Sequence, residues 1–80
     1  MKYIATFFTH SGAIKYQRYL KKNNIPVDLM PVPRKISSSC GVAAAFQTDW
    51  DIKKIISEDI ETIYLVEEKD YKLIYRSEEG

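Results

Sequence analysis

The segment from Pro31 to Gly41 constrains the fold of this chain more than any other stretch of its sequence. Pro31 and Pro33 have fixed φ angles and no backbone N–H groups, so the apolar strand before them cannot extend its ladder through them. Two cations, three serines and the single cysteine follow, and Gly41 permits a turn that other residues would resist. The segment is therefore predicted to be a loop with secondary structure on both sides.

Before this loop, the sequence predicts a strand, a helix and a second strand. Residues 2–8 are mostly aromatic and β-branched, which is typical of a buried strand. Thr9 or Ser11 can cap a helix over residues 12–23, where apolar residues recur at helical spacing and cations occupy the last turn. Two asparagines and a proline end the helix, and residues 27–32 are predicted to form the second strand.

After the loop, we expect a strand, a short helix and two further strands. Residues 42–46 are predicted as a strand despite three alanines, because only five or six residues separate Gly41 from the next helix cap. The isoleucines within residues 49–57 recur at i, i+3 and i+4, which predicts a second helix. Residues 60–66 are expected to form a strand, and residues 71–76 a short extra strand hairpinned to it.

The predicted order, β-α-β-β-α-β with a C-terminal addition, indicates an α+β, ferredoxin-like sandwich. With 80 residues and no linker or internal repeat, the chain is expected to form a single domain, residues 1–80. Two helices should cover one face of an antiparallel sheet. The other face is expected to be partly apolar and to be covered, or to meet another subunit, through four tyrosines: Tyr3, Tyr64, Tyr71 and Tyr75.

Composition narrows the expected location and partners. No apolar run approaches membrane-spanning length, and the N-terminal apolar stretch is too short for a signal peptide. One cysteine cannot form the internal disulfides of small secreted domains. Twelve basic and eleven acidic residues give a net charge of +1, and residues 42–46 lack the interleaved aromatics and cations of an RNA-binding strand. We expect a cytoplasmic protein that binds neither a membrane nor nucleic acid.

Cys40 is the candidate reactive residue. It lies in a polar loop beside cations and hydroxyl groups, conditions that favour a thiolate. A right-handed crossover makes the first two predicted strands parallel, so residues 9–12 and the loop should lie at the same end of the domain. His10 is therefore expected to approach Cys40.

The residues around Cys40 predict a site that favours an anion. Arg34, Lys35, a protonated His10 and the N–H groups at the helix start all suit a thiolate or persulfide, and Ser39 with the turn at Gly41 adds polar donors. Each residue has an ordinary alternative role. The cysteine can be an inert apolar side chain, the histidine a capping group, the cations solubilising charges, and the serines turn residues.

Other chemistries lack the residues that they need. A metal chaperone of this fold would need a second cysteine near the first, because one thiolate cannot hold a soft ion tightly. The sequence has no glycine-rich phosphate loop, no Gly-x-Ser-x-Gly turn and no paired catalytic carboxylates in an apolar setting. We therefore expect neither a metal nor a cofactor.

The loop also carries a resemblance to a known family. Pro-Val-Pro-Arg (31–34), Ser-Ser-Cys-Gly (38–41), the Phe-Phe-Thr-His-Ser strand end (7–11) and the tyrosine-rich C-terminal strand are similar to the selenium/sulfur carrier protein-like family, over nearly the whole chain. The resemblance implies an α/β sandwich whose cysteine carries sulfur or selenium as a persulfide or perselenide. A protein donor or acceptor would be the partner, and the chain would be a carrier or accessory protein rather than a stand-alone enzyme.

The alternative hypothesis is a non-catalytic interaction module. In that case the tyrosine-bearing sheet face would build a homodimer or dock on a larger enzyme, and no chemistry at Cys40 would be needed. Substitution of Cys40 would then leave assembly intact, whereas substitution of Tyr64 or Tyr75 would break it.

Overall fold

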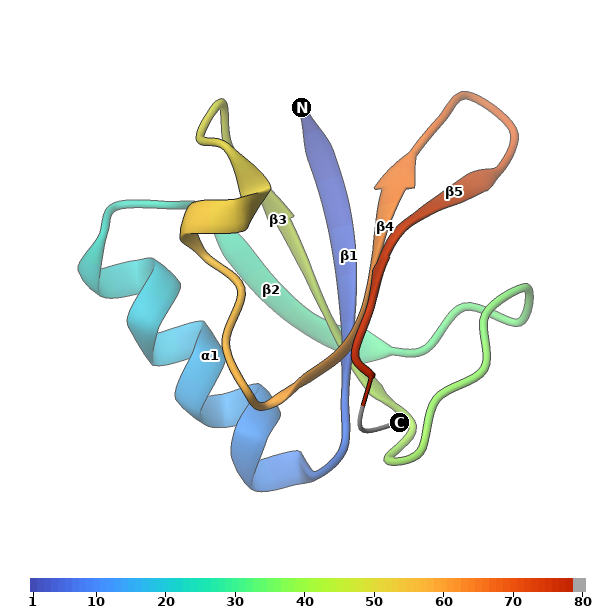
Figure 1. Ribbon diagram of the computed structural model, residues 1–80, viewed down its shortest axis with the longest axis horizontal. Coiled ribbons are helices and arrows are strands. Elements are labelled where there is room, and N and C mark those ends of the chain that lie inside the picture. The colour runs from blue at the N-terminus through green and yellow to red at the C-terminus, as the bar shows by residue number, and fades with distance from the viewer. Residues whose placement is uncertain (79–80) are drawn as a thin grey trace.

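The computed structural model describes residues 1–78 and has one helix packed on a five-stranded antiparallel sheet (Figure 1). The strands lie in the order β2-β3-β1-β4-β5, so the first strand of the chain is in the middle of the sheet. The elements in chain order are β1 (Lys2–Phe7), α1 (His10–Lys22), β2 (Val27–Pro31), β3 (Val42–Gln47), the 3-10 turn η1 (Ile52–Lys54), β4 (Ile60–Val66) and β5 (Tyr71–Arg76).

The α+β class, the antiparallel sheet and the extra C-terminal strand are confirmed. The alanine-rich segment is a strand, as predicted: β3 pairs with β2 on one side and β1 on the other, and Ala43 and Ala44 are fully buried. In the centre of a sheet, small side chains leave room for the layers packed on both faces. No helix within residues 1–78 is long and apolar enough to span a membrane.

The second predicted helix, over residues 49–57, is wrong, and the two-helix ferredoxin-like sandwich is not supported. The segment instead contains η1, whose start is capped by Asp51 as it accepts a hydrogen bond from the Lys53 amide at 3.1 Å. The carbonyl of Ile55 accepts from the Tyr16 hydroxyl at 2.8 Å, and the Asp59 amide donates to the Ser57 hydroxyl at 3.3 Å. These bonds replace the i→i+4 bond that an α-helix would need at this point.

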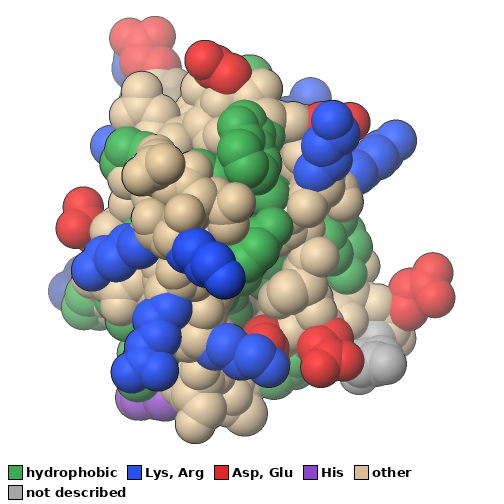
Figure 2. Space-filling model, turned by 90° about the vertical axis from the view of Figure 1, so that its left-hand side faces the viewer, with side chains coloured by type: hydrophobic (Ala, Val, Ile, Leu, Met, Phe, Trp, Pro, Cys, Tyr) green, Lys and Arg blue, Asp and Glu red, His purple; other side chains and the backbone are tan. Residues whose placement is uncertain are grey.

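One face of the sheet packs against α1. The helix buries Ala13, Tyr16 and Leu20 in a core that includes Phe7 and Phe46. The Tyr16 ring lies 5.5 Å from the Phe7 ring and 5.9 Å from the Phe46 ring, centroid to centroid, within the range of favourable aromatic pairs. The solvent side of α1 is basic, and Figure 2 shows the Lys and Arg side chains gathered there.

The other face is covered by the loop between β2 and β3, residues 32–41, here called the thiol loop. Ile36 is only 6% exposed and packs with Ile4 and Ala43 of the sheet. A side chain from an irregular segment therefore covers part of this face, which the sequence had led us to expect the tyrosines to cover.

The four tyrosines do not share a face, so that prediction is wrong for two of them. Tyr64 and Tyr71 border the cluster around Ile36, but Tyr3 and Tyr75 pack in the core on the helix side. Tyr3 is next to Ile4 in β1, and neighbouring residues of a strand point to opposite faces. An irregularity in the β4–β5 register at Ile63 and Tyr64 changes which residues of β5 share a face, and alternation alone could not reveal it.

Candidate functional site

Cys40 lies at the point where the thiol loop re-enters the sheet. The next residue, Gly41, has a φ of +76°, in the left-handed region that glycine adopts without strain. The Val32 amide donates to the Gly41 carbonyl at 3.2 Å, which closes the base of the loop beside the β2–β3 ladder. The loop thus holds its cysteine at a fixed position, one residue from a closed base.

The thiol of Cys40 is neither fully buried nor free in solvent. Its side chain is half-buried and packs against the core on the helix side. The Sγ atom lies 3.5 Å from the Val42 carbonyl oxygen, to which the S–H donates, and the Cys40 amide donates to the Ser38 hydroxyl at 3.4 Å. The sulfur therefore belongs to a partly buried residue and is oriented by the backbone of Val42.

The structure places His10 beside Cys40, the juxtaposition expected from the strand directions. His10 is the first residue of α1, and its Nε2 lies 2.8 Å from the backbone carbonyl oxygen of Cys40. A carbonyl can only accept, so Nε2 carries the hydrogen of this bond. The imidazole contacts the backbone of Cys40, so it can influence the sulfur only by fixing the position of that backbone.

The start of α1 is already occupied by groups of the protein itself. Thr9 is the N-cap, and its Oγ1 accepts from the Gly12 amide at 3.0 Å. Asp59 lies so close to Gly12 that a Cβ built there would be 3.0 Å from the Asp59 Cβ. The Asp59 carboxylate also lies 3.7 Å from the Lys15 amine. A carboxylate thus stands at the positive end of the helix dipole, where the sequence had suggested a thiolate.

Arg34 and Lys35 face the turn between β4 and β5. Both line a hollow formed with residues 66–71, and Cys40 is not among the residues that border it. The Lys35 amine donates to the Lys69 carbonyl at 3.0 Å and lies 4.0 Å from the Asp70 carboxylate. Arg34 and Lys35 therefore lie beside the β4–β5 turn and do not form the predicted cluster around the thiol.

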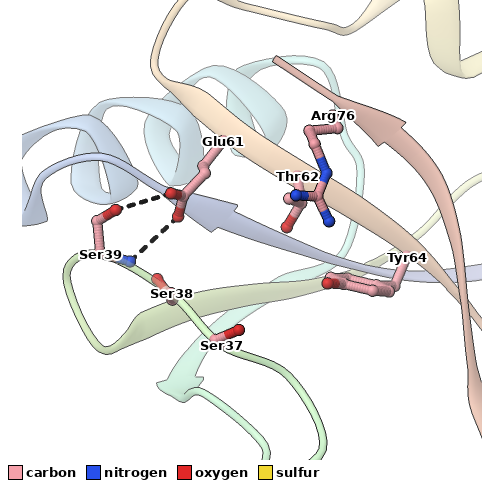
Figure 3. A pocket seen from close by; sticks show the side chains of 7 residues that line it. All are labelled: Ser37, Ser38, Ser39, Glu61, Thr62, Tyr64 and Arg76. Carbon is pink, nitrogen blue, oxygen red and sulfur yellow. Dashed lines mark hydrogen bonds between the residues drawn. The ribbon is translucent and has the colours of Figure 1, made fainter. Parts of the chain in front are cut away.

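Ser39 is tied to β4 by Glu61, a residue that sequence reasoning missed. The Ser39 amide and hydroxyl donate to the two carboxylate oxygens of Glu61, at 3.1 and 2.7 Å (Figure 3). Only the strand order could have revealed the pair, because 22 residues separate the two positions and no local motif marks Glu61.

A hollow of about 250 Å³ adjoins this pair and is here called the serine hollow. Figure 3 shows its lining, which comes from the thiol loop, β4 and β5: Ser37, Ser38, Ser39, Glu61, Thr62, Tyr64 and Arg76. Within residues 1–78, no three His, Cys, Asp or Glu side chains are grouped as a metal site would require.

The chain matches a known protein family. The family model described as "Putative Se/S carrier protein-like" matches residues 2–75, nearly the whole chain. No curated protein and no solved structure matches the chain significantly.

Proposed function

This chain belongs to the Se/S carrier protein-like family, and we propose that it carries a sulfur or selenium atom on Cys40. The observation that carries the proposal is the way the backbone around the free thiol is held. Ser39 is bound to Glu61 on one side, the Cys40 carbonyl is bound to His10, and Gly41 closes the loop on the other side. A carrier needs its thiol at a defined position, and these contacts with the backbone around Cys40 support the proposal.

The proposed loading step is a thiol exchange. The Cys40 thiolate attacks the outer sulfur of a persulfide on a donor protein; a new S–S bond forms at Sγ, the donor's S–S bond breaks, and the donor leaves as a thiolate. No external oxidant is needed, because the oxidation level of the transferred sulfur is unchanged. Selenium would follow the same course, with an S–Se bond formed at Sγ. On delivery, the thiolate of an acceptor attacks the outer sulfur on Cys40, and Cys40 leaves as a thiolate.

The remaining predicted site residues have supporting roles in this proposal. His10 is a positioning residue that fixes the Cys40 carbonyl, and Ser39 with Gly41 sets the course of the backbone through the cysteine. Arg34 and Lys35 precede Cys40 in an exposed part of the loop, and we assign them to contact with the donor or acceptor protein. A single free thiol with this role suits a reducing compartment such as the cytoplasm.

The interaction-module alternative loses its main support, since only Tyr64 and Tyr71 remain on the face that the four tyrosines were expected to share. That face is closed in its centre by Ile36. The alternative still makes a distinct prediction, because in an interaction module substitution of Cys40 would leave assembly intact.

Intact-mass analysis tests the proposal directly. Reduced protein is incubated with a small persulfide such as glutathione persulfide, and the product is treated with cyanide, which removes outer sulfur as thiocyanate. We expect a gain of about 32 Da, one sulfur atom, that cyanide reverses. Cys40→Ser is the matched control and should gain nothing. A wild-type protein that forms only a mixed disulfide with glutathione, and never the persulfide, would overturn the carrier function.

A further inference from the structure

The serine hollow is a second feature of the thiol loop, separate from the sulfur. Its floor is the sheet surface of β4 and β5, and its wall is the serine run that precedes the cysteine (Figure 3). Cys40 does not line it, and the Cys40 side chain packs toward the opposite, helix-side core. The proposed sulfur transfer on Cys40 therefore does not involve the serine hollow, and the hollow has no role in it.

The hollow holds more hydrogen-bond donors than acceptors. Within residues 1–78, the hydroxyls of Ser37 and Tyr64 have no hydrogen-bond partner, and the Arg76 guanidinium has no carboxylate within 4.0 Å. The Ser38 hydroxyl accepts from the Cys40 amide, so its own hydrogen is also free to donate. The one carboxylate in the lining, Glu61, already accepts a bond at each oxygen from Ser39.

These donors line the hollow from two sides. Arg76 lies opposite Thr62 in the β4–β5 register, and Figure 3 shows its guanidinium extending over β4 beside the ring of Tyr64. Ser37 and Ser38 line the hollow from the loop, and in Figure 3 the Ser37 hydroxyl points toward the Tyr64 side and the Ser38 hydroxyl toward Glu61. The Thr62 hydroxyl is taken by its bond to Thr6, which leaves Arg76 and three hydroxyls as the available donors.

We propose that the serine hollow binds a small molecule through an anionic group with several oxygens, a carboxylate or a tetrahedral oxyanion. Arg76 supplies the charge, since a guanidinium pairs with two oxygens of such a group at once, and Ser37, Ser38 and Tyr64 supply neutral donors. Glu61 stands at the Ser39 end and disfavours a second negative charge there. The preferred ligand thus carries one anionic group, directed toward Arg76.

Anion titration followed by amide chemical shifts tests this proposal. Uniformly 15N-labelled protein is titrated with sodium acetate or with sodium sulfate, with sodium chloride added to keep the ionic strength constant. We expect saturable shifts at residues 37–39, 62–64 and 76 with at least one of the two anions. The anion that saturates at the lower concentration shows whether a carboxylate or a tetrahedral group is preferred.

Two arginine variants separate a site from general attraction to positive charge. Arg76→Gln should weaken binding about tenfold or more, because a charge-assisted pair is lost. Arg34→Gln is the matched control, since it removes an equal charge from a part of the thiol loop that lies outside the hollow, and binding should be unchanged. Tyr64→Phe keeps the ring and removes one donor, so it should weaken binding a few-fold.

Three outcomes would overturn the proposal: shifts that never saturate, shifts that are equal in Arg76→Gln and Arg34→Gln, or shifts centred on residues 34–35 and 66–71. If Arg76→Gln does not fold, the comparison of Tyr64→Phe with wild type decides, and equal affinity would reject the site. None of these results bears on the thiol, so the persulfide experiment and this one can fail independently.

Discussion

Glu61 holds Ser39 by two hydrogen bonds, one from its amide at 3.1 Å and one from its hydroxyl at 2.7 Å. The contact joins the thiol loop to β4, on the far side of β1 from the strands that the loop connects. This contact fixes the position of the loop directly before Cys40, because Ser39 is the residue that precedes the cysteine.

Glu61→Ala should therefore loosen the thiol loop more than it destabilises the protein. Because the pair is exposed, we expect the free energy of unfolding to fall by about 1 kcal/mol. Amide hydrogen exchange at residues 38–40 should rise well beyond what this global change explains. Urea unfolding and native-state exchange measure the two effects. Glu68→Ala, an exposed glutamate of the β4–β5 turn, is the control, and equal exchange in both variants would contradict the prediction.

His10 offers a test of positioning against proton transfer. If its role is the bond from Nε2 to the Cys40 carbonyl, His10→Gln should retain part of the sulfur loading, because an amide N–H can also donate to a carbonyl. His10→Ala should load several-fold more slowly. The measurement is the rate of persulfide formation on Cys40 by intact mass. Equal loss in the two variants would point instead to an acid–base role of the imidazole.

Ile36 should be worth more to stability than its place in a loop suggests. Its side chain is 6% exposed and packs on Ile4 and Ala43, so Ile36→Ala should lower the free energy of unfolding by about 2 kcal/mol. Ile36→Val should cost about 1 kcal/mol or less. Denaturant unfolding gives both values, with Ile14→Ala on the exposed side of α1 as a control expected near zero. A small effect of Ile36→Ala would mean that the loop does not close this face in solution.

Gly41 and Gly12 should respond differently to added side chains. Gly41 has a positive φ and open space around its Cβ position, so Gly41→Ala should cost about 1 kcal/mol through the backbone alone. Gly41→Asn should cost less, because asparagine tolerates this conformation. At Gly12 a Cβ would meet Asp59, so Gly12→Asn should be no better than Gly12→Ala. Thermal unfolding of the four variants distinguishes the two causes.

Tyr16 should make stability fall at high pH. Burial raises the pKa of its hydroxyl above the ordinary value, and the neighbouring Tyr19 acts in the same direction. In the unfolded chain the Tyr16 phenol ionises at about pH 10, whereas in the folded chain it keeps its proton. Above that pH the unfolded state therefore binds fewer protons than the folded state. The contribution of the Tyr16 hydroxyl to the free energy of unfolding is therefore complete below about pH 10 and is lost as the pH rises further.

Comparison with Tyr16→Phe isolates this effect. At neutral pH the variant should be less stable by about 1 kcal/mol, because the buried Ile55 carbonyl loses its donor. The difference from wild type should shrink between about pH 9 and pH 11, measured by urea unfolding at each pH. Tyr71→Phe, on the other sheet face, is the control. A difference that is constant with pH would show that Tyr16 does not titrate with unfolding.

Local sequence patterns predicted most strands and the single α-helix, but not the long-range contacts of the site. The end of β1, the proline at the end of β2 and the cap at Thr9 are all signalled within a few residues, and they suffice to bring His10 toward Cys40. The missing second helix depends on the Tyr16 hydroxyl, 39 residues away, which takes the Ile55 carbonyl. Strand order and register determine what Glu61, Ile36 and Arg76 contact. The residues next to them in the sequence indicate neither the strand order nor the register.

The central place of β1 has a consequence for how the chain reaches its fold. β1 pairs with β3 on one side and with β4 on the other, so both of its partners lie far from it in the sequence. The main core also needs Ile60 and Ile63 of β4, a strand that follows β1, β2 and β3 in the sequence. Few stable partial structures are therefore expected during folding, because the core closes only when β1 and β4, which are far apart in the sequence, come together.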